Sequence, residues 1–286
     1  MSNISASQVK ELREKTGLGL MDCKKALQEA NGDLNLAIEE LRKTSGLKAS
    51  KKSSRSAADG LIGIKSSEGK VFMLEINCET DFVARDESFN SFTKEVLDIY
   101  SSNIDKSLQE LLDEGIEEKR EKLVQKLGEN IVVRRLATSE FRADCSGGYL
   151  HSNSKIGTIV SLKGGSEELA KDIAMHAAAT DPMAISPSDI SQEVIDKERE
   201  IYEAQSQESG KPEDIVEKMI EGKVQKFLSE VSLTEQDFVK EPSLKIKDLL
   251  KDNEASILGF TRFEVGEGIE VEKVDFAAEV MSQIEN

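Results

Sequence analysis

The stretch KVFMLEINCETDFVARDESFNSFTKEVLDIY, residues 70–100, joins two different local patterns. Its opening residues, KVFMLEIN, form a nearly continuous apolar run that predicts a strand. Its closing residues, DESFNSFTKEVLDIY, are amphipathic and predict a helix. Between them lies CETDFVAR, residues 78–85, in which an acidic residue is followed at once by a large aromatic one, Asp81-Phe82. The start of a helix does not require such a pair.

Two interpretations of Asp81-Phe82 stay open from the residues alone. In the first, Thr80 or Asp81 caps the helix and Phe82 packs beneath it as a hydrophobic staple. In the second, Phe82 protrudes as an anchor for a partner's pocket, and the Asp81 carboxylate disturbs polar groups beside that pocket. Aromatic anchors on rigid turns carry much of the binding free energy of protein interfaces.

The order strand, turn, strand, helix occurs a second time along the chain. The segment DGLIGIKSSEGKVFMLEIN, residues 59–77, leads into the helix described above. The segment GGYLHSNSKIGTIVSLKGGSEELAKDIAMHAAA, residues 147–179, repeats that order at an offset of 88 residues, from Gly60 to Gly148. GENIVVRRLATSEF, residues 128–141, supplies one more strand between the copies. The pattern predicts the α+β class with a duplicated core.

Near the amino terminus, the sequence carries the start and stop signals of three short helices. Ser5 and Gln8 make a capping-box pattern, and TGLG, residues 16–19, ends the first helix. Asp22 and Asp33 are placed to cap the second and third helices. Three short helices within about 45 residues resemble a ubiquitin-associated (UBA) domain.

Two features of this region bear on binding. Leu20 and Met21 are apolar residues in the predicted first loop, where they either face a partner or close the small core. The basic segment KASKKSSR, residues 48–55, is rich in serine and is interpreted as a solvated linker rather than a phosphate-binding patch.

A helical hairpin is predicted closer to the carboxyl end. A charged helix runs from about Ser191 to Ser209, Gly210 ends it, and Pro212 opens a second helix. The apolar residues of the two helices exceed what they need to cover each other, so the hairpin is expected to dock on a partner or to dimerise. The segment DFAAEVMSQIEN, residues 275–286, predicts a short closing helix.

These patterns divide the chain into five predicted parts. They are a UBA-like three-helix domain with its linker at 1–55, a first core subdomain at 56–140, a second core subdomain at 141–183 and 229–263, a helical-hairpin dimerisation module at 184–228, and a carboxyl-terminal module at 264–286.

Charge and composition exclude several function classes. The chain has 38 basic and 55 acidic side chains, a formal charge of −17, so phosphate backbones repel it and no direct binding to nucleic acid is expected. No segment resembles a signal peptide or a membrane span, so no membrane association is expected. Three cysteines without CxxC spacing fit a reduced, cytoplasmic location.

The sequence offers little for catalysis. His176 lies in a small-residue helix, where a packing role is expected, whereas His151 lies at a strand end or loop, where exposure is expected. A hydrolase built on Cys78 or Cys145 with His151 stays a distant alternative. Phosphate-loop, dinucleotide, nucleophile-elbow and zinc-ligand motifs are missing from the sequence. We therefore expect a binding protein that is not an enzyme and has no cofactor and no metal.

Several unusual sequence motifs, spread over essentially the whole chain, are similar to those of the translation elongation factor Ts family. They are VKELREKTGLGLMDCKKALQEANGDL, AADG, LEINCETDFVAR, KLGENIVVRR, ESGKP, EKMIEGK, EVSLTEQDFV and GFTRFEVGEGIE.

This resemblance implies a guanine-nucleotide exchange factor that binds elongation factor Tu in its GDP-bound and nucleotide-free states. In the family, the TDFV motif, here Thr80 to Val83 with Asp81 and Phe82 at its centre, intrudes beside the partner's magnesium site and speeds GDP release.

Further partner contacts follow from the same resemblance. Arg13, Leu20 and Met21 match positions that grip the partner's GTPase domain, and His151 matches a residue that meets another domain. Position 20 is Leu where some relatives carry Met, which preserves an apolar contact. The alternative function is that of a UBA-domain adaptor whose first 50 residues choose the partner.

Overall fold

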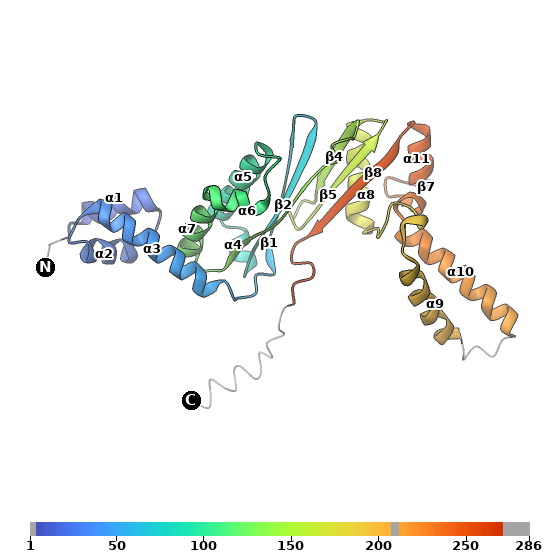
Figure 1. Ribbon diagram of the computed structural model, residues 1–286, viewed down its shortest axis with the longest axis horizontal. Helices are drawn as coiled ribbons and strands as arrows, with labels where there is room; N and C mark the ends of the chain where they lie inside the picture. The colour runs from blue at the N-terminus through green and yellow to red at the C-terminus, as the bar shows by residue number, and fades with distance from the viewer. Residues whose placement is uncertain (1–3, 207–211, 271–286) are drawn as a thin grey trace, which may run out of the picture. The chain divides into compact units, whose positions relative to one another are not determined.

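The computed structural model describes residues 4–206 and 212–270, and it mixes helices with antiparallel sheet (Figure 1). The α+β prediction is thus confirmed. Contacts along the chain define two compact units. One takes in Met1–Leu61, Leu74–Arg135 and the chain from Glu264, and the other takes in Ile62–Met73 and Leu136–Phe263. Within the described ranges, none of the helices combines the length and the apolar composition needed to cross a membrane.

The chain begins with three helices: α1 (Ala6–Thr16), α2 (Leu20–Glu29) and α3 (Leu34–Lys52). The predicted capping box of Ser5 and Gln8 is confirmed, and Gly17 ends α1 in the left-handed conformation, with φ 70°. Asp33 caps α3 by accepting hydrogen bonds from the backbone N–H groups of Asn35 and Leu36. The helices enclose one apolar cluster, which includes Val9, Leu12, Cys23, Leu27, Ala37 and Leu41.

Two predictions for this region are wrong. Asp22 does not cap α2, because the extended backbone of Gly19 starts the helix three residues earlier and places Asp22 in its first turn. Leu20 and Met21 therefore lie in a helix and not in a loop. In addition, α3 continues through Lys52 into the segment that the sequence predicts to be a linker. Ala and Lys favour a helix there, and Lys48 pairs with Asp22 at 3.3 Å.

The predicted first strand pair is confirmed as β1 (Asp59–Ser67) and β2 (Lys70–Cys78). Their turn uses Glu68 and Gly69, both at positive φ, which matches the twist of a tight hairpin. The later strand β3 (Ile131–Thr138) lies beside β2, so the sheet order is β1-β2-β3. Between β2 and β3 the chain forms α4 (Asp81–Ala84), α5 (Glu87–Ser101), α6 (Leu108–Leu111), a π-helical turn (Leu112–Ile116) and α7 (Glu117–Leu127).

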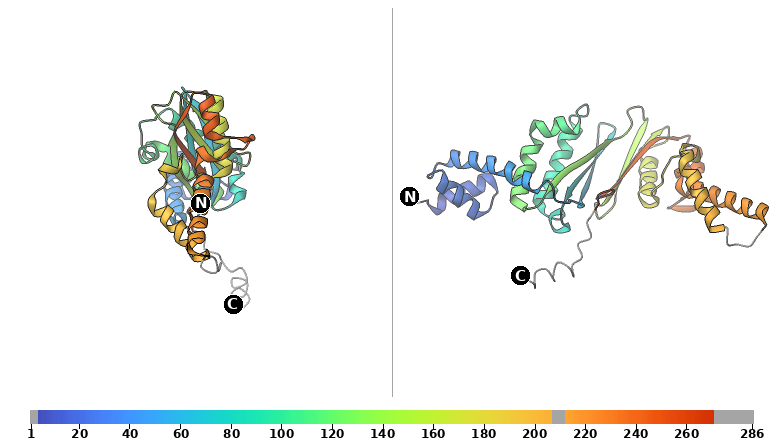
Figure 2. Two further views of the ribbon diagram at one scale, coloured as in Figure 1. Left: turned by 90° about the vertical axis from the view of Figure 1, so that its right-hand side faces the viewer. Right: turned by 60° about the horizontal axis from the view of Figure 1, so that its bottom comes forward.

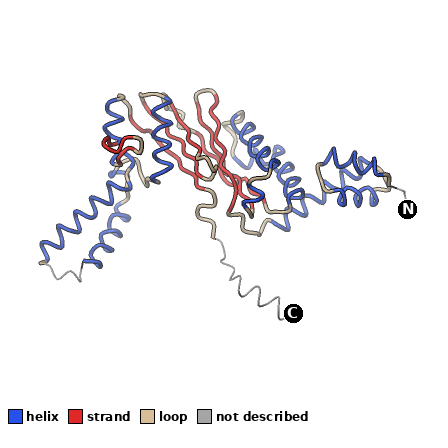
Figure 3. The backbone as a smooth tube through the Cα atoms, turned by 180° about the vertical axis from the view of Figure 1, so that it is seen from behind, coloured by secondary structure: helices blue, strands red, loops and turns tan. Residues whose placement is uncertain are grey.

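The second copy of the pattern is also confirmed as strand, turn, strand, helix. Strands β4 (Cys145–Leu150) and β5 (Ile156–Lys163) pair in antiparallel fashion, and α8 (Glu167–Thr180) follows and packs on them. A Cβ atom at Gly147 would lie 2.2 Å from the backbone N of Lys171, so only glycine permits this close contact of helix and strand. Strand β8 (Ser256–Glu264) lies beside β5, as Figure 3 shows, and the order β4-β5-β8 matches that of the first sheet.

The predicted helical hairpin is confirmed as α9 (Gln192–Ser206) and α10 (Glu213–Val231), which lie side by side in Figure 2. Ile220, Val224 and Leu228 of α10 are buried in their contact. The predicted helix end at Gly210 and the predicted closing helix at 275–286 lie outside the described residues.

Several short elements of the second unit have no counterpart in the sequence predictions. They are two 3₁₀ turns (Pro187–Asp189 and Leu233–Glu235), β6 (Asp237–Phe238), β7 (Glu241–Lys245) and α11 (Ile246–Asp252).

His176 has the packing role that the sequence predicts. It is fully buried in α8, where Nε2 lies 2.9 Å from Oε1 of Gln236, and Nδ1 accepts a hydrogen bond from the backbone N–H of Val239 at 3.3 Å. These contacts suit the neutral ring with its proton on Nε2, because protonated Nδ1 would face another donor. Burial lowers the pKa of His176, and the hydrogen bond that its Nε2 donates to Gln236 offsets only part of this effect.

The pKa of His176 leads to a prediction about acid. An unfolded chain binds a proton at this histidine near pH 6.5, while the folded chain binds it only at lower pH. We therefore expect the free energy of unfolding to fall as the pH drops below about 6.5, by at most about 1.4 kcal/mol per pH unit from this group. Urea titrations from pH 7.5 to 5.5 measure the slope. His176→Gln should flatten it, whereas equal slopes in the two proteins would contradict the prediction.

Candidate functional site

The side chain of Phe82 is exposed at the point where β2 passes into α4. Its exposed fraction is 81%, while its neighbours Val83 and Ala84 are buried beneath the same helical turn. The hydroxyl of Thr80 caps that turn by accepting a hydrogen bond from the backbone N–H of Val83 at 3.4 Å. Thr80 thus caps a helix as the first interpretation expects, but that helix is the short α4, and Asp86 caps the longer helix Glu87–Ser101. The staple half is wrong, because Val83 and Ala84 take the core-facing positions. Phe82 has the exposure that a partner-facing anchor needs.

Asp81 places a carboxylate next to the exposed ring. It is the first residue of α4, and its Oδ2 accepts a hydrogen bond from Nη2 of Arg85 at 2.8 Å, one helical turn later. Both side chains remain substantially exposed, at 44% for Asp81 and 79% for Arg85. An ion pair this open to water is weak, so the carboxylate can exchange Arg85 for another cationic or polar group.

Glu129, which lies two residues before β3, supports this turn. Its Oε2 accepts hydrogen bonds from the backbone N–H groups of Glu79 and Thr80, both at 3.0 Å, and its Oε1 accepts one from the Thr80 hydroxyl at 2.6 Å. Sequence reasoning missed this residue, because nothing about an acid before a strand indicates contact with a turn 49 residues away.

A second set of hydrogen bonds connects the turn that carries Phe82 to the residues at and just after the end of α3. Oε1 of Glu79 accepts from the backbone N–H of Asn130 at 2.6 Å, and the Asn130 amide donates to the carbonyl of Arg55 at 2.9 Å. Arg55 itself lies 3.6 Å from Glu79, and Lys52 donates to the carbonyl of Gly128. The linker interpretation of residues 48–55 is therefore wrong as far as Lys52, which is helical. Arg55 stays solvated, with 54% of its side chain exposed, but contacts Glu79 beside the turn that carries Phe82.

Arg13, Leu20 and Met21 lie close together along the chain at one end of the three-helix bundle. Arg13 is exposed in the last turn of α1, and Leu20 and Met21 open α2 after a three-residue connection, Gly17–Gly19. Their exposed fractions are 53% for Leu20 and 73% for Met21. The sequence left open whether Leu20 and Met21 face a partner or close the small core. Their high exposure rules out closure of the core.

His151 is exposed, as predicted, and it belongs to the other compact unit. It follows β4 directly. Its backbone N–H donates to the carbonyl of Ile156 at 2.9 Å, and its Nδ1 lies 3.2 Å from the hydroxyl of Tyr149. The backbone is thus fixed by the β4–β5 turn, while one edge of the ring faces Tyr149.

The thiols lack the properties of catalytic nucleophiles. Cys78 is buried, and its Sγ donates to the carbonyl of Thr80 at 3.2 Å. Cys145 is half-buried, and burial, together with Asp144 and Glu167, raises the pKa of its thiol. A nucleophilic cysteine needs the opposite shift. The hydrolase alternative therefore gains no support from either residue.

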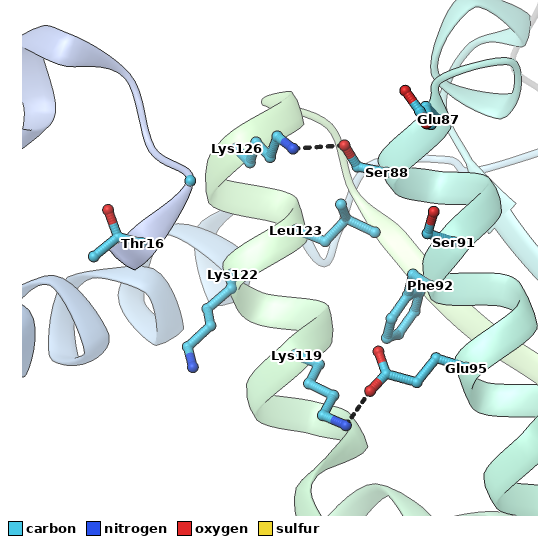
Figure 4. Close-up of a pocket in the computed structure, with 11 residues that line it drawn as sticks. Thr16, Glu87, Ser88, Ser91, Phe92, Glu95, Lys119, Lys122, Leu123 and Lys126 are labelled. Atoms are coloured by element: carbon cyan, nitrogen blue, oxygen red, sulfur yellow. Dashed lines mark hydrogen bonds and ion pairs between the residues drawn. The ribbon is translucent and has the colours of Figure 1, made fainter. Parts of the chain in front are cut away.

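An open cavity of about 470 Å³ lies between the end of α1 and helices α5 and α7 (Figure 4). Three lysines of α7 line it, but Lys126 donates to the Ser88 hydroxyl, Lys119 pairs with Glu95, and Lys122 pairs with Glu118. Two of these cations are paired with carboxylates, whereas Lys126 faces a neutral hydroxyl and keeps its charge. Because Glu87 and Glu95 also line the cavity, it is poorly suited to a phosphate group. Across residues 4–206 and 212–270, no group of three or more His, Cys, Asp or Glu side chains is placed to hold a metal ion.

Comparisons with known proteins point to one family. The family model described as Elongation factor TS matches residues 79–267. The chain is 54% identical to "Elongation factor Ts" of Hahella chejuensis over 286 residues, which cover 99% of each chain. It is 53% identical to the protein of the same name in Marinobacter nauticus, over 98% of this chain and 97% of the relative. The protein of that name in Francisella tularensis subsp. novicida is 52% identical, over 99% of each chain.

Proposed function

The chain belongs to the elongation factor Ts family, and from that membership we propose that it is the guanine-nucleotide exchange factor of elongation factor Tu. The family gives the chain a role in translation elongation and protein biosynthesis. The proposed activity is acceleration of GDP release, so that GTP can bind. The chain makes and breaks no covalent bond in this activity, and it is therefore not an enzyme in the chemical sense.

The observation that carries this proposal is the exposed Phe82 on a turn fixed by Thr80 and Glu129. An apolar ring that is 81% exposed gains no free energy from its own fold. When such a ring enters a partner's pocket, the burial contributes to binding instead. Asp81 would enter with it and bring a negative charge to the partner's magnesium and phosphate site.

The mechanism follows from thermodynamic linkage. A GTPase holds GDP largely through its phosphate-binding loop and a bound Mg²⁺ ion. If the factor binds best to the arrangement in which Mg²⁺ is displaced, it weakens the binding of GDP, and GDP weakens the binding of the factor by the same ratio. The factor then needs no nucleotide, metal or cofactor of its own. It would bind both the GDP-bound and the nucleotide-free partner.

Two further contacts are proposed for the same partner. Arg13, Leu20 and Met21 are each exposed and would hold the GTPase domain, and His151 would contact a different domain. The three-helix bundle at 1–55 would act as a UBA-like domain, and the two core subdomains would be 56–140 and 141–183 with 229–263. The remaining modules would be the hairpin at 184–228 and the carboxyl-terminal segment at 264–286. We place this activity in the cytoplasm, without nucleic-acid or membrane binding.

The helical hairpin is proposed as a dimerisation module. Ile201 of α9 and Ile215 of α10 are 41% and 44% exposed, outside the contact between the two helices. Deleting residues 186–228 and bridging the gap should leave a folded core, because α9 and α10 bury their other apolar residues against each other. Light scattering of the full-length and deleted chains should show a dimer only for the former. A monomeric full-length chain, or unfolding of the shortened one, would contradict this prediction.

Release of a fluorescent GDP analogue tests the exchange activity. Elongation factor Tu from a bacterium with a similar factor, such as Hahella chejuensis, is loaded with the analogue, and excess GDP is added with and without this chain. The proposal expects the fluorescence to decay faster as the concentration of the factor rises. The same decay at every concentration of the folded factor would overturn it.

A further inference from the structure

We propose that Glu129 is a positioning residue for nucleotide exchange, which holds the Thr80–Val83 turn in the shape that presents Phe82. This inference rests on the proposed function. The hydrogen bonds of Glu129 go to the backbone and the hydroxyl of the residues that precede the ring. Its effect on the partner would therefore pass through Phe82.

The three hydrogen bonds of Glu129 fix both the chain path and the cap. A carboxylate has four acceptor positions, and three of them are occupied here by donors from two consecutive residues, Glu79 and Thr80. Hydrogen bonds to an ionised group are shorter and stronger than those between neutral groups. They fix the chain at residues 79 and 80, between the end of β2 at Cys78 and Phe82.

The Thr80 hydroxyl connects Glu129 to the helical turn. A hydroxyl has one proton, and here that proton is donated to Oε1 of Glu129 at 2.6 Å. The lone pairs of the same oxygen then point to the backbone N–H of Val83, which donates at 3.4 Å. Glu129 thus orients the cap of α4, the turn that carries Phe82.

Glu129 is itself held in place by the chain around it. Gly128 ends α7 in the left-handed conformation, with φ 82°, and the next residue is Glu129. The backbone N–H of the following residue, Asn130, donates to Oε1 of Glu79 at 2.6 Å. The turn at residues 79–83 and the turn at residues 128–130 therefore hold each other through the carboxylates of Glu79 and Glu129. Neither turn can shift without breaking hydrogen bonds to a charged group.

Glu129→Gln is the test substitution. The glutamine keeps the size of the side chain but replaces one acceptor oxygen with a donor NH₂, which would face N–H or O–H donors. We expect GDP release per unit concentration of factor to fall by about 10-fold, because the turn would spend less time in the competent shape. Hydrogen exchange at the backbone N–H groups of Thr80 and Val83 should become faster, while far-ultraviolet circular dichroism stays the same.

A double-mutant cycle separates positioning from a general loss of structure. If Glu129 acts through Phe82, adding Glu129→Gln to Phe82→Ala should lower the rate much less than it does in the wild type. The matched control is Glu110→Gln in the same unit, because Glu110 also accepts from a backbone N–H and a hydroxyl, both of Ser107. This control variant should stimulate GDP release at the same rate as the wild type.

A second pair of variants serves if Glu129→Gln does not fold. Thr80→Val removes only the hydroxyl and should slow release, while Thr80→Ser keeps the hydroxyl and should preserve it. The inference would be overturned if Glu129→Gln and Phe82→Ala had additive effects on the rate of GDP release. It would also be overturned if the Glu129→Gln variant stimulated GDP release as fast as the wild type. Equal rates for the two Thr80 variants would overturn it as well. A wild-type chain that does not stimulate release would instead overturn the proposed function, and that outcome is visible before any variant is tested.

Discussion

Truncating Phe82 to alanine should slow stimulated GDP release by roughly 30- to 1000-fold. Aromatic anchors at interfaces typically contribute about 2–4 kcal/mol when they are truncated, and about 1.4 kcal/mol corresponds to a factor of ten. The free energy of unfolding should hardly change, because the ring is 81% exposed in the free chain. Release of the fluorescent GDP analogue and urea titration, measured on the same preparation, give the two quantities.

Phe89→Ala is the matched control for this experiment. Phe89 lies seven residues later in α5, and its side chain is fully buried. The same truncation there should cost about 3–5 kcal/mol of stability, as for other core phenylalanines. At temperatures where it remains folded, the Phe89 variant should still stimulate release. If Phe82→Ala instead lost stability as Phe89→Ala does and kept normal release, Phe82 would be part of the core and not an anchor.

The second large effect is expected at Glu75, whose side chain is fully buried in β2. Its Oε2 accepts from Nε of Arg135 at 2.5 Å, and its Oε1 accepts from Nη1 of Arg134 at 3.0 Å. The same Oε1 also accepts from the backbone N–H of Gly266 at 2.9 Å and from the Asn77 amide at 3.0 Å. Glu75→Ala would leave all four donors without this acceptor.

We expect Glu75→Ala to destabilise the chain by about 3 kcal/mol, at the low end for breaking a buried ion pair. The low end applies because Arg134 and Arg135 are 24% and 29% exposed and can reach water. Urea titration at pH 7 measures the loss. Glu39→Ala, which removes an exposed ion pair with Lys43, should leave the stability nearly unchanged. Equal stability of both variants would show that the Glu75 network contributes nothing net.

The pH dependence of the Glu75 variant has a definite sign. Burial alone would raise the pKa of this carboxyl, but hydrogen bonds from Gly266, Asn77 and Arg135 and the charge of Arg135 hold it below the ordinary value. A lowered folded-state pKa means that the stabilisation is fully present above the ordinary carboxyl range. It is lost as the pH falls from that range through the lower pKa of the folded state. The difference in stability between wild type and Glu75→Ala should therefore shrink in acid.

Local patterns in the sequence predicted much of the fold. The caps at Ser5 and Asp33 and the hairpin turn at Glu68 depend on residues that lie next to each other, so the sequence displays them directly. Periodicity also identified the repeated order of strands and helices. The short segments β6 and β7 escaped prediction, because two to five residues are too few to show a period.

The candidate site could be predicted only in part. The unusual pair Asp81-Phe82 was visible in the sequence, but its exposure depends on which neighbours take the core positions, and Val83 and Ala84 do so. The contact of Glu129 with Thr80 joins residues 49 positions apart, so it follows from the fold and not from any local pattern. The same holds for the contact of Arg55 with Glu79, which joins residues far apart in the sequence.

Phe82 and His151 belong to different compact units of one chain. Under the proposed function, the two residues are separate attachments to one partner, and binding of the first raises the effective concentration of the second. Loss of either attachment then weakens the complex steeply, because the remaining single contact binds the partner much less tightly than the linked pair. GTP would therefore need to displace only the contact at the nucleotide site to let the whole factor dissociate.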